Sequence, residues 1–431
     1  MKISPIGPQQ VIEKKKKYLI PCAYHFYKNP PQMVRGEGPY LYDSEGKAYL
    51  DLYSGVSVNA LGHCHPEVTD AICKQVKTLQ HTTTIYLTEP IVNLAEALAQ
   101  VLPAGLTRSF FCASGTEANE GAALLATLHT GRNEFLAFQN GLHGRTKLGM
   151  SLTGLSFWRT DPHPVGGITF VPPPTCKTCP FGKELSSCKY ECVDAVEKAI
   201  QTSTSGKPAA MFVEPVQGNG GITVPPPEYF TRLKVVLDKY GMLLIADEVQ
   251  SGLGRTGKMY AMQHWNVTPD ILTGGKALGG GTPIGYFSTT DKIAASFTRP
   301  SASTFGGNLV TAVAGLEVLK ILQRDQLVKR SEELGKFLRT GLERLAQKVN
   351  FVSEVRGLGL MLGVELQAAQ NKTAAEITDL ILENMKDTGF LLGKTGSGRN
   401  VLTLMPPLII TENQLQGGLD ALEKQFNLIA N

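Results

Sequence analysis

Residues 243–258, LLIADEVQSGLGRTGK, and residues 269–281, PDILTGGKALGGG, decide the fold class of this chain. The first segment begins with an apolar run that ends at Asp247, as a buried strand of a parallel sheet does. Ligands of open α/β sheets bind at the carboxyl ends of the strands, so Asp247 falls at a binding edge. Lys276 follows in a glycine-rich loop, where the backbone can approach a flat ligand closely. Taken alone, each residue is as well explained by a helix cap or a surface loop.

Similar short β-like runs recur on both sides of this region, separated by helix-like stretches: SFFCAS (109–114), EFLAFQN (134–140), GITFVP (167–172) and AAMFVEP (209–215). This alternation predicts an α/β fold whose mostly parallel sheet is covered by helices on both faces. We expect a large domain over residues 61–311. A smaller α+β domain is expected to combine residues 1–60, with a hairpin around Asp43 to Gly46, and the amphipathic helices and strands of residues 312–431.

The composition and the charge of the chain argue against several classes of protein. A chain of 431 residues that is 42% hydrophobic is too apolar to be disordered, and a formal net charge of +4 is small for its length. The basic run Lys14–Lys17 is typical of a solvated helix face. No stretch has the roughly 18 uninterrupted apolar residues of a membrane span, and the N-terminal residues lack a signal-peptide layout. We therefore expect a cytoplasmic protein with neither nucleic-acid nor membrane partners.

A phosphate site is predicted where SFFCAS gives way to a helix at Ser114, Gly115 and Thr116. The first amides of a helix lack intrahelical acceptors, and the helix dipole favours an anion there. An ordinary helix cap would also explain Ser114 and Thr116.

The segment GLGRTGK (252–258) matches two nucleotide-binding patterns, G-x-G-x-x-G and the start of a P-loop. Both patterns require the glycines to join a strand directly to a helix. Here five residues, Asp247 to Ser251, stand between the apolar run and the first glycine, and Met259 occupies the Ser/Thr position of the P-loop. We therefore reject a nucleotide site.

As a set, six motifs resemble those of the class III aminotransferases, in the same order: SGTEAN, GLHGRT, EPVQGNGG, IADEVQSGLGRTGK, TGGKALGGGTPIG and STFGGN. The similarity runs from about Val34 to Leu408. It implies the pyridoxal-5'-phosphate (PLP) transferase fold of type I and PLP as the cofactor. It also implies a homodimer in which Thr304 reaches the cofactor phosphate of the neighbouring subunit.

The resemblance assigns roles position by position. Lys276 matches the Schiff-base lysine, Asp247 the partner of the pyridine nitrogen, and Gln250 the residue near the ring hydroxyl. The remaining implied cofactor contacts are Ser114, Gly115, Thr116, Leu142, His143, Glu214, Val249 and Thr304, and the implied substrate contacts are Tyr53, Arg145 and Thr403.

Two departures from the family pattern concern the ligands. Leu142 replaces an aromatic residue, so an aliphatic contact would replace ring stacking, at a cost of about 0.5–1.5 kcal/mol. Thr403 stands where many members carry a carboxylate-binding arginine, and a threonine offers no bidentate grip. If the last strand includes Arg399, that arginine shares its face with Thr403 but lies about 13 Å away.

Arg145 is retained and implies that an acid group of the substrate, a carboxylate or a phosphonate, is bound there. A structural ion pair is the alternative role. A third departure is the cluster Cys176, Cys179, Cys188 and Cys192, whose spacing also fits a zinc site. The resemblance supports no metal role for these cysteines.

The expected activity is transfer of the amino group of an ω-amino acid, or a similar primary amine, to a small oxo acid such as pyruvate or glyoxylate. Lys276 would act as the proton-transferring base. The alternative is elimination by an ammonia-lyase or phospho-lyase, which needs no arginine at position 403. A non-catalytic binding protein is disfavoured because Lys276, Asp247 and Gln250 are all retained.

Overall fold

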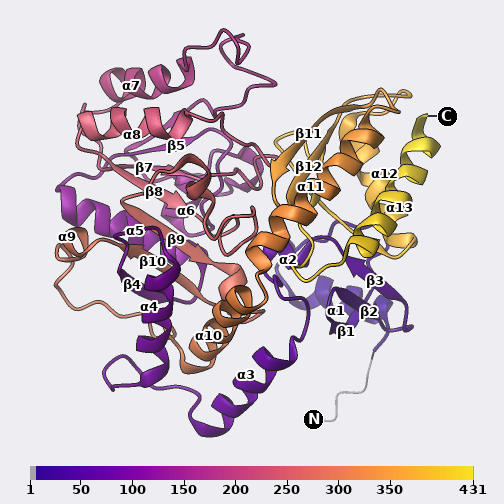
Figure 1. Cartoon of the computed structure of the whole chain (residues 1–431), viewed down its shortest axis with the longest axis horizontal. Coiled ribbons are helices and arrows are strands. Elements are labelled where there is room, and N and C mark those ends of the chain that lie inside the picture. Colours follow the sequence, from indigo (N-terminus) through magenta and orange to yellow (C-terminus); the bar gives the residue numbers. More distant parts are fainter. Residues whose placement is uncertain (1–5, 431) are drawn as a thin grey trace.

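The computed structural model describes residues 6–430, in which three β-sheets are arranged with helices around them (Figure 1). The largest sheet has seven strands in the order β4-β10-β9-β8-β7-β5-β6. Its strands are β4 (Arg108–Cys112), β5 (Phe135–Phe138), β6 (Ile168–Val171), β7 (Ala210–Val213), β8 (Leu243–Asp247), β9 (Ile271–Gly275) and β10 (Gly285–Thr289). Strand β10 runs in the opposite direction to the other six strands, so the predicted mostly parallel sheet is confirmed.

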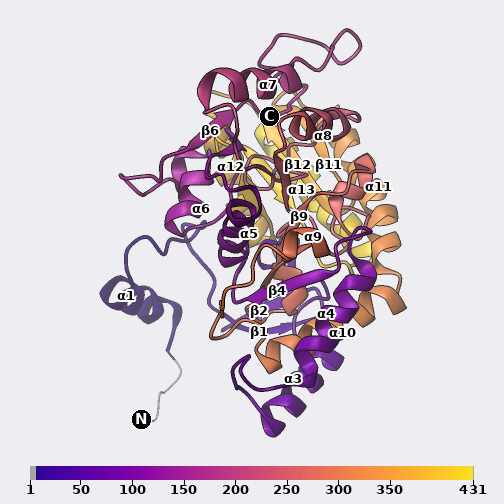
Figure 2. The same cartoon turned by 90° about the vertical axis from the view of Figure 1, so that its left-hand side faces the viewer.

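The side-chain alternation of β8 shows why this sheet is buried on both faces. Leu244 and Ala246 pack into the core beneath α7 (Glu191–Ser203) and α8 (Tyr229–Lys239), whereas Ile245 packs on the face covered by α5 (Gly115–Thr130). The two helix layers are seen in Figures 1 and 2. Asp247 shares the parity of Ile245, so its carboxylate points toward α5.

Further helices and turns complete this part of the chain: α3 (Pro66–Thr78), α4 (Glu89–Val101), α6 (Lys147–Leu152), α9 (Asp291–Ala294), and 3₁₀ turns at Ser156–Trp158, Ala261–Trp265 and Lys276–Gly279. No helix in the described part of the chain has both the length and the apolar character to span a bilayer.

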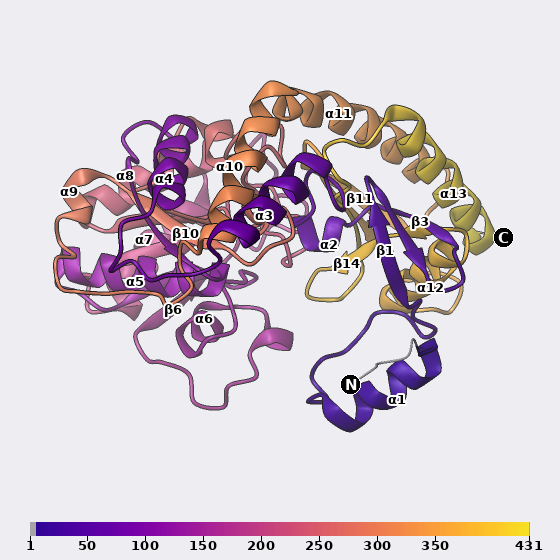
Figure 3. The same cartoon turned by 90° about the horizontal axis from the view of Figure 1, so that it is seen from below.

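Segments from the N-terminal and C-terminal parts of the chain lie together in the second region, as Figure 3 shows. One sheet joins β1 (Met33–Glu37), β2 (Tyr40–Asp43) and β3 (Ala48–Asp51) to β13 (Phe390–Leu391), which lies parallel to β3. The other has the order β11-β12-β15-β14, built from β11 (Val352–Leu358), β12 (Met361–Leu366), β14 (Gly393–Thr395) and β15 (Val401–Leu404). The helices here are α1 (Pro8–Tyr18), α2 (Ser54–Ser57), α11 (Leu327–Ala346), α12 (Ala374–Asp387) and α13 (Glu412–Ala430). Helix α10 (Leu309–Arg324) precedes α11 and packs mainly against α3 and α4 of the first region.

The hairpin predicted at Asp43 to Gly46 is present between β2 and β3. Two strands of the large sheet, β9 and β10, were not predicted, because β9 ends in two glycines and β10 begins at the end of the glycine-rich stretch 279–285, so that both resemble parts of a loop. The expected domain boundary at residues 311/312 falls inside α10, which packs against α3 and α4. The division into domains remains a prediction.

The GLGRTGK segment forms turns after β8 and leads to a 3₁₀ turn, with no α-helix starting at its glycines. This agrees with the rejection of a nucleotide site. Arg255 within it is only 2% exposed and donates hydrogen bonds to the carbonyl oxygens of Leu360 (3.0 Å) and Pro406 (2.5 Å). Its own carbonyl accepts from the Leu360 amide (3.0 Å) and the Ser331 hydroxyl (3.0 Å). Arg255 therefore joins the large sheet region to the C-terminal region.

We predict that Arg255→Ala lowers the free energy of unfolding by roughly 3 kcal/mol, because it leaves a cavity and two buried carbonyl groups without donors. Urea denaturation followed by circular dichroism measures the loss. Arg344→Ala, which truncates an exposed arginine of α11, is the matched control and should change stability by less than about 0.5 kcal/mol. Equal midpoints for the two variants would contradict the structural role of Arg255.

Candidate active site

The Asp247 carboxylate is buried at the end of β8 and has three hydrogen-bond donors. Oδ2 accepts from Asn119 Nδ2 (2.8 Å) and lies 2.8 Å from His143 Nδ1, while Oδ1 accepts from the Val249 amide (3.1 Å). The Asn119 amide is itself oriented, because its Oδ1 accepts from the Thr273 hydroxyl (2.7 Å). The carboxylate is therefore held in one orientation by α5, the GLHGRT loop and its own turn.

Asn119 and Thr273 were not among the predicted site residues. The sequence feature that could have identified Asn119 as a site residue is its position in SGTEAN, one helical turn after Gly115. The donation from Asn119 Nδ2 to the His143 carbonyl (2.7 Å) shows that this residue also fixes the GLHGRT loop.

His143 is fully buried against Asp247. Burial by itself lowers the pKa of this imidazole, but the hydrogen bond and charge of Asp247, with a contribution from Glu214, outweigh burial and raise the pKa. The imidazole ring therefore acts as a donor to the Asp247 carboxylate.

Lys276 follows β9 directly, with a backbone φ of +40°, a value uncommon outside glycine. The preceding chain is tightly confined, because a Cβ on Gly274 would lie 2.2 Å from the Tyr286 ring. Burial lowers the pKa of Lys276, although the charges of Asp247 and Glu214 act in the opposite direction. The structure thus brings Lys276 and Asp247 into one electrostatic group, as the motif order predicted.

The N-terminus of α5 has the features of an anion site. Ser114 is the N-cap and accepts a hydrogen bond from the Glu117 amide (3.3 Å). The Gly115 and Thr116 amides have no acceptor among residues 6–430. A Cβ on Gly115 would lie 2.7 Å from the Val249 side chain, so glycine is required here. Two free amides thus sit beside the turn that follows Asp247.

The GLHGRT loop packs against this helix end through Thr116. The Thr116 hydroxyl accepts from the Arg145 amide (3.1 Å), and a Cβ on Gly144 would lie 2.1 Å from the same oxygen. The backbone of Arg145 is therefore fixed relative to the candidate phosphate site, while its side chain is exposed.

Glu214 belongs to the same buried group as Asp247, His143 and Lys276. Its carboxyl accepts from the amides of Leu142 (2.8 Å) and Gly218 (2.9 Å). Burial, helped by the charge of Asp247, raises the pKa of Glu214 to about 7, against the opposing effects of His143 and the two amides. A Cβ on Gly218 would collide with Gln250 Oε1 at 1.8 Å, so Gln250 lies against this loop.

A cavity of about 530 Å³ adjoins these residues. Among the predicted site residues, Tyr53, Leu142 and Arg145 line it. Other parts of its wall are aromatic, contributed by Tyr24, Phe26, Phe157 and Trp158, and Arg399 also projects into it.

The C-terminal strand corrects two expectations. Thr403 is fully buried in β15, where its hydroxyl bonds that of Thr395 (2.8 Å), so it does not line the cavity. Arg399 was expected on the strand face, but β15 begins at Val401 and Arg399 lies in the preceding turn with a φ of +53°. Because the turn redirects its side chain, Arg399 reaches the cavity that Thr403 does not.

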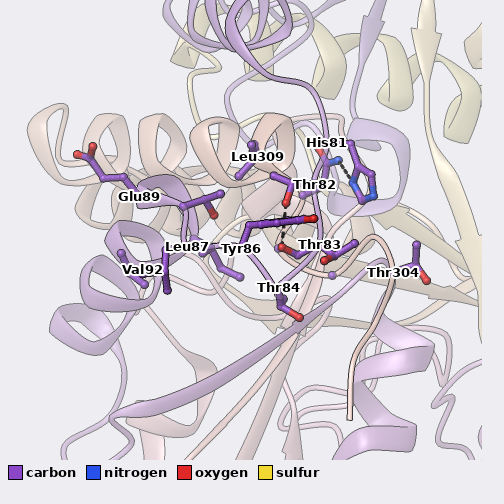
Figure 4. A pocket seen from close by; sticks show the side chains of 15 residues that line it. His81, Thr82, Thr83, Thr84, Tyr86, Leu87, Glu89, Val92, Thr304 and Leu309 are labelled. Carbon is purple, nitrogen blue, oxygen red and sulfur yellow. Dashed lines mark hydrogen bonds between the residues drawn. The ribbon is translucent and has the colours of Figure 1, made fainter. Parts of the chain in front are cut away.

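Thr304 lies in a different place. It lines a second cavity of about 530 Å³ together with residues 82–84 and 86–89 (Figure 4). The surrounding surface exposes large apolar side chains, with Ile85 at 83%, Leu87 at 103% and Phe305 at 60% exposure. Within one chain, Thr304 does not line the cavity that contains Arg145.

The four cysteines of the cluster are not gathered into a group of potential metal ligands in the described residues. All eight cysteines are free, and residues 6–430 contain no group of three or more potential metal ligands. Cys188 instead contacts the Glu191 carboxylate (3.2 Å) and accepts from the Tyr190 amide (3.1 Å). The zinc hypothesis raised by the spacing is therefore not supported.

Comparison of the chain with known proteins identifies its family. Residues 25–426 match the family described as aminotransferase class III. An acetylornithine aminotransferase of Mycobacterium leprae is 42% identical over 92% of this chain and 91% of its own. The alanine–glyoxylate aminotransferase 2 homolog 2 of Arabidopsis thaliana, described as mitochondrial, is 38% identical over 96% of this chain and 86% of its own.

Among solved structures, a phospholyase from Arthrobacter in complex with phosphoethanolamine superposes with a TM-score of 0.88 at 32% identity, covering 97% of this chain and 99% of that one. The sequence and structural matches confirm the expected type I transferase fold. The chain belongs to the class III aminotransferases and is a PLP-dependent enzyme of that family.

Proposed function

We propose that this enzyme moves the amino group of an ω-amino acid, or a similar primary amine, to a small oxo acid such as pyruvate or glyoxylate. The observation that carries the proposal is the desolvated Lys276 amine in one group with Asp247, next to a cavity that presents Arg145. The family relation supports aminotransferase chemistry, and these residues support the choice of substrate.

The residues fit PLP. The free Gly115 and Thr116 amides suit its phosphate, the fixed Asp247 carboxylate suits its pyridine nitrogen, and the Lys276 amine suits its aldehyde. When bound, PLP supplies an electron sink for the charge left when a proton leaves the substrate carbon. The further contacts proposed for it are Ser114, Leu142, His143, Glu214, Val249 and Gln250.

Lys276 Nζ is proposed to remove the proton from the substrate carbon that bears nitrogen. Burial lowers the pKa of this amine and so increases the neutral fraction that can accept a proton. The Asp247 carboxylate would hold a proton at the pyridine nitrogen of bound PLP, and Asn119 and His143 position the carboxylate for that task. Arg145 binds the acid group of the substrate, and Tyr53 contributes to the cavity wall.

The acceptor is proposed to be small because Thr403 is buried and neutral. No guanidinium stands at position 403, where many class III aminotransferases carry a carboxylate-binding arginine. A single-carboxylate oxo acid needs only one cationic partner.

We also propose a homodimer in which Thr304 contacts the cofactor phosphate of the neighbouring subunit. The exposed apolar surface around Ile85, Leu87 and Phe305 is typical of a surface that a protein partner covers. Thr304 lies beside this surface in the second cavity (Figure 4). The free state of all eight cysteines is consistent with our proposal of a reducing, cytoplasmic location.

Elimination is the second candidate function. The Arthrobacter relative is a phospholyase, and a lyase makes no use of an arginine at position 403. If the substrate carried a leaving group beside the deprotonated carbon, loss of that group would replace the second half of the transfer.

The Lys276→Ala variant is predicted to lose activity and the visible absorbance of the cofactor–lysine adduct, because no other residue in the group offers an amine. Absorbance spectra of purified protein and turnover assays measure both. Lys258→Ala, which changes an exposed lysine of the same glycine-rich region, should leave both unchanged. Retention of the absorbance in Lys276→Ala would show that Lys276 is not the lysine that binds the cofactor.

Without an oxo acid acceptor, the PLP-loaded enzyme is predicted to form one equivalent of carbonyl product per active site and then stop. Without an acceptor, the amino group taken from the first substrate molecule would stay in the active site, so each site would react once. A panel of ω-amino acids, aminoalkyl phosphonates and their hydroxylated analogues would be tested, with product and ammonia quantified. Continuing release of ammonia beyond one equivalent would establish the lyase instead.

Arg145→Gln is predicted to raise the KM for acidic amines about 10- to 100-fold with a smaller change in kcat, because a charge-assisted hydrogen bond contributes about 1.5–3 kcal/mol. Steady-state kinetics on an acidic amine and a neutral amine of equal length measure the effect. The neutral amine is the internal control and should be nearly unaffected. Equal losses for both amines would indicate a structural role for Arg145.

A further inference from the structure

The cavity that contains Arg145 is positively charged. Its ionisable lining residues are Tyr24, Tyr53, Arg145, Lys394 and Arg399, and no aspartate or glutamate is among them. The Lys394 ammonium is paired with Asp379, which lies outside the lining. Two guanidinium groups therefore remain to set the charge that the cavity presents.

Neither guanidinium is satisfied by the protein. Within residues 6–430, neither Arg145 nor Arg399 has a side-chain hydrogen bond or an ion pair. The backbone of each is nonetheless fixed: the Arg145 amide donates to the Thr116 hydroxyl (3.1 Å), and the Arg399 amide donates to the Gly396 carbonyl (3.0 Å). Two unpaired cations on fixed backbone thus face one cavity.

Arg399 is held by an aromatic cluster. Its Cζ lies 4.6 Å from the centroid of the Phe157 ring, 5.8 Å from that of Tyr24 and 6.0 Å from that of Phe26. Such contacts engage the faces of the planar guanidinium and leave the N–H groups at its edge for an acceptor in the same plane. The three rings come from the N-terminal segment and from the turn after α6, so tertiary packing selects this position.

We propose that Arg399 acts with Arg145 to bind a substrate whose far end is a phosphonate or phosphate-ester group. This inference rests on the proposed function, since it takes the cavity to be the amine-substrate site. One carboxylate has two oxygens and one charge, which a single arginine fork satisfies. A phosphoryl group near neutral pH has three acceptor oxygens and a charge of about −1.5 to −2, enough for two forks. Binding of a phosphoryl group would therefore use the second unpaired arginine, Arg399, as well as Arg145.

Calorimetric titration of the PLP-loaded enzyme tests the proposal with amine-free ligands that cannot react: propylphosphonate, ethyl phosphate, butyrate and glutarate. The variants are Arg399→Gln and the conservative Arg399→Lys, which keeps the charge and loses the fork. Arg232→Gln is the matched control, because Arg232 also stacks on an aromatic ring, at 4.6 Å from the Tyr190 centroid, and does not line the cavity.

We expect Arg399→Gln to raise the Kd for propylphosphonate and ethyl phosphate at least tenfold, and the Kd for butyrate less than threefold. Arg399→Lys should give intermediate values, and Arg232→Gln should match the wild type. The two phosphorus ligands separate a phosphonate from a phosphate-ester preference by their relative Kd in the wild type.

Three results with the Arg399 variants would overturn the proposal: unchanged phosphonate affinity in both variants, equal weakening of all four ligands, or a larger loss for glutarate than for propylphosphonate. The last would assign Arg399 to a dicarboxylate. The wild-type enzyme could also bind neither phosphorus ligand and still form one equivalent of product in the acceptor-free assay. That result would contradict this inference without contradicting the proposed aminotransferase function.

Discussion

The Asp247 carboxylate is the constraint on which the site depends. A buried carboxylate is costly unless its oxygens are hydrogen-bonded, and here Asn119, His143 and the Val249 amide supply the donors. Each donor belongs to a different segment, so satisfying one charge fixes α5, the GLHGRT loop and the turn after β8 together. The same three segments carry the free amides of the helix end and the fixed backbone of Arg145.

Two charge systems lie side by side in this enzyme. One is buried and rich in carboxylates, where Asp247 and Glu214 face the Lys276 amine and burial shifts the pKa of the amine downward and that of Glu214 upward. The other is the open cavity, where Arg145 and Arg399 have no acidic partner among residues 6–430. This separation suits proton transfer to a lysine at one end of a substrate and recognition of an anion at the other.

The cavity also depends on contacts between the two regions of the chain. Residues from the N-terminal segment, from the loops after β5 and from the β14–β15 turn all line it. Arg255 holds those regions together through the carbonyls of Leu360 and Pro406. A substitution that loosens this contact would therefore alter the cavity as well as stability.

The sequence by itself determined the fold class, because the alternation of buried strands and helices is a local property, and the family, because its six motifs occur in order. The same resemblance predicted that Lys276, Asp247 and the helix end at Ser114 to Thr116 belong to one site. Strands β9 and β10 escaped prediction because their strand character depends on pairing within the sheet. Only the tertiary structure decided that Thr403 is buried and that Arg399 reaches the cavity. A turn with a left-handed residue breaks the period-two rule, and no pattern of spacing records where the redirected side chain meets Phe157.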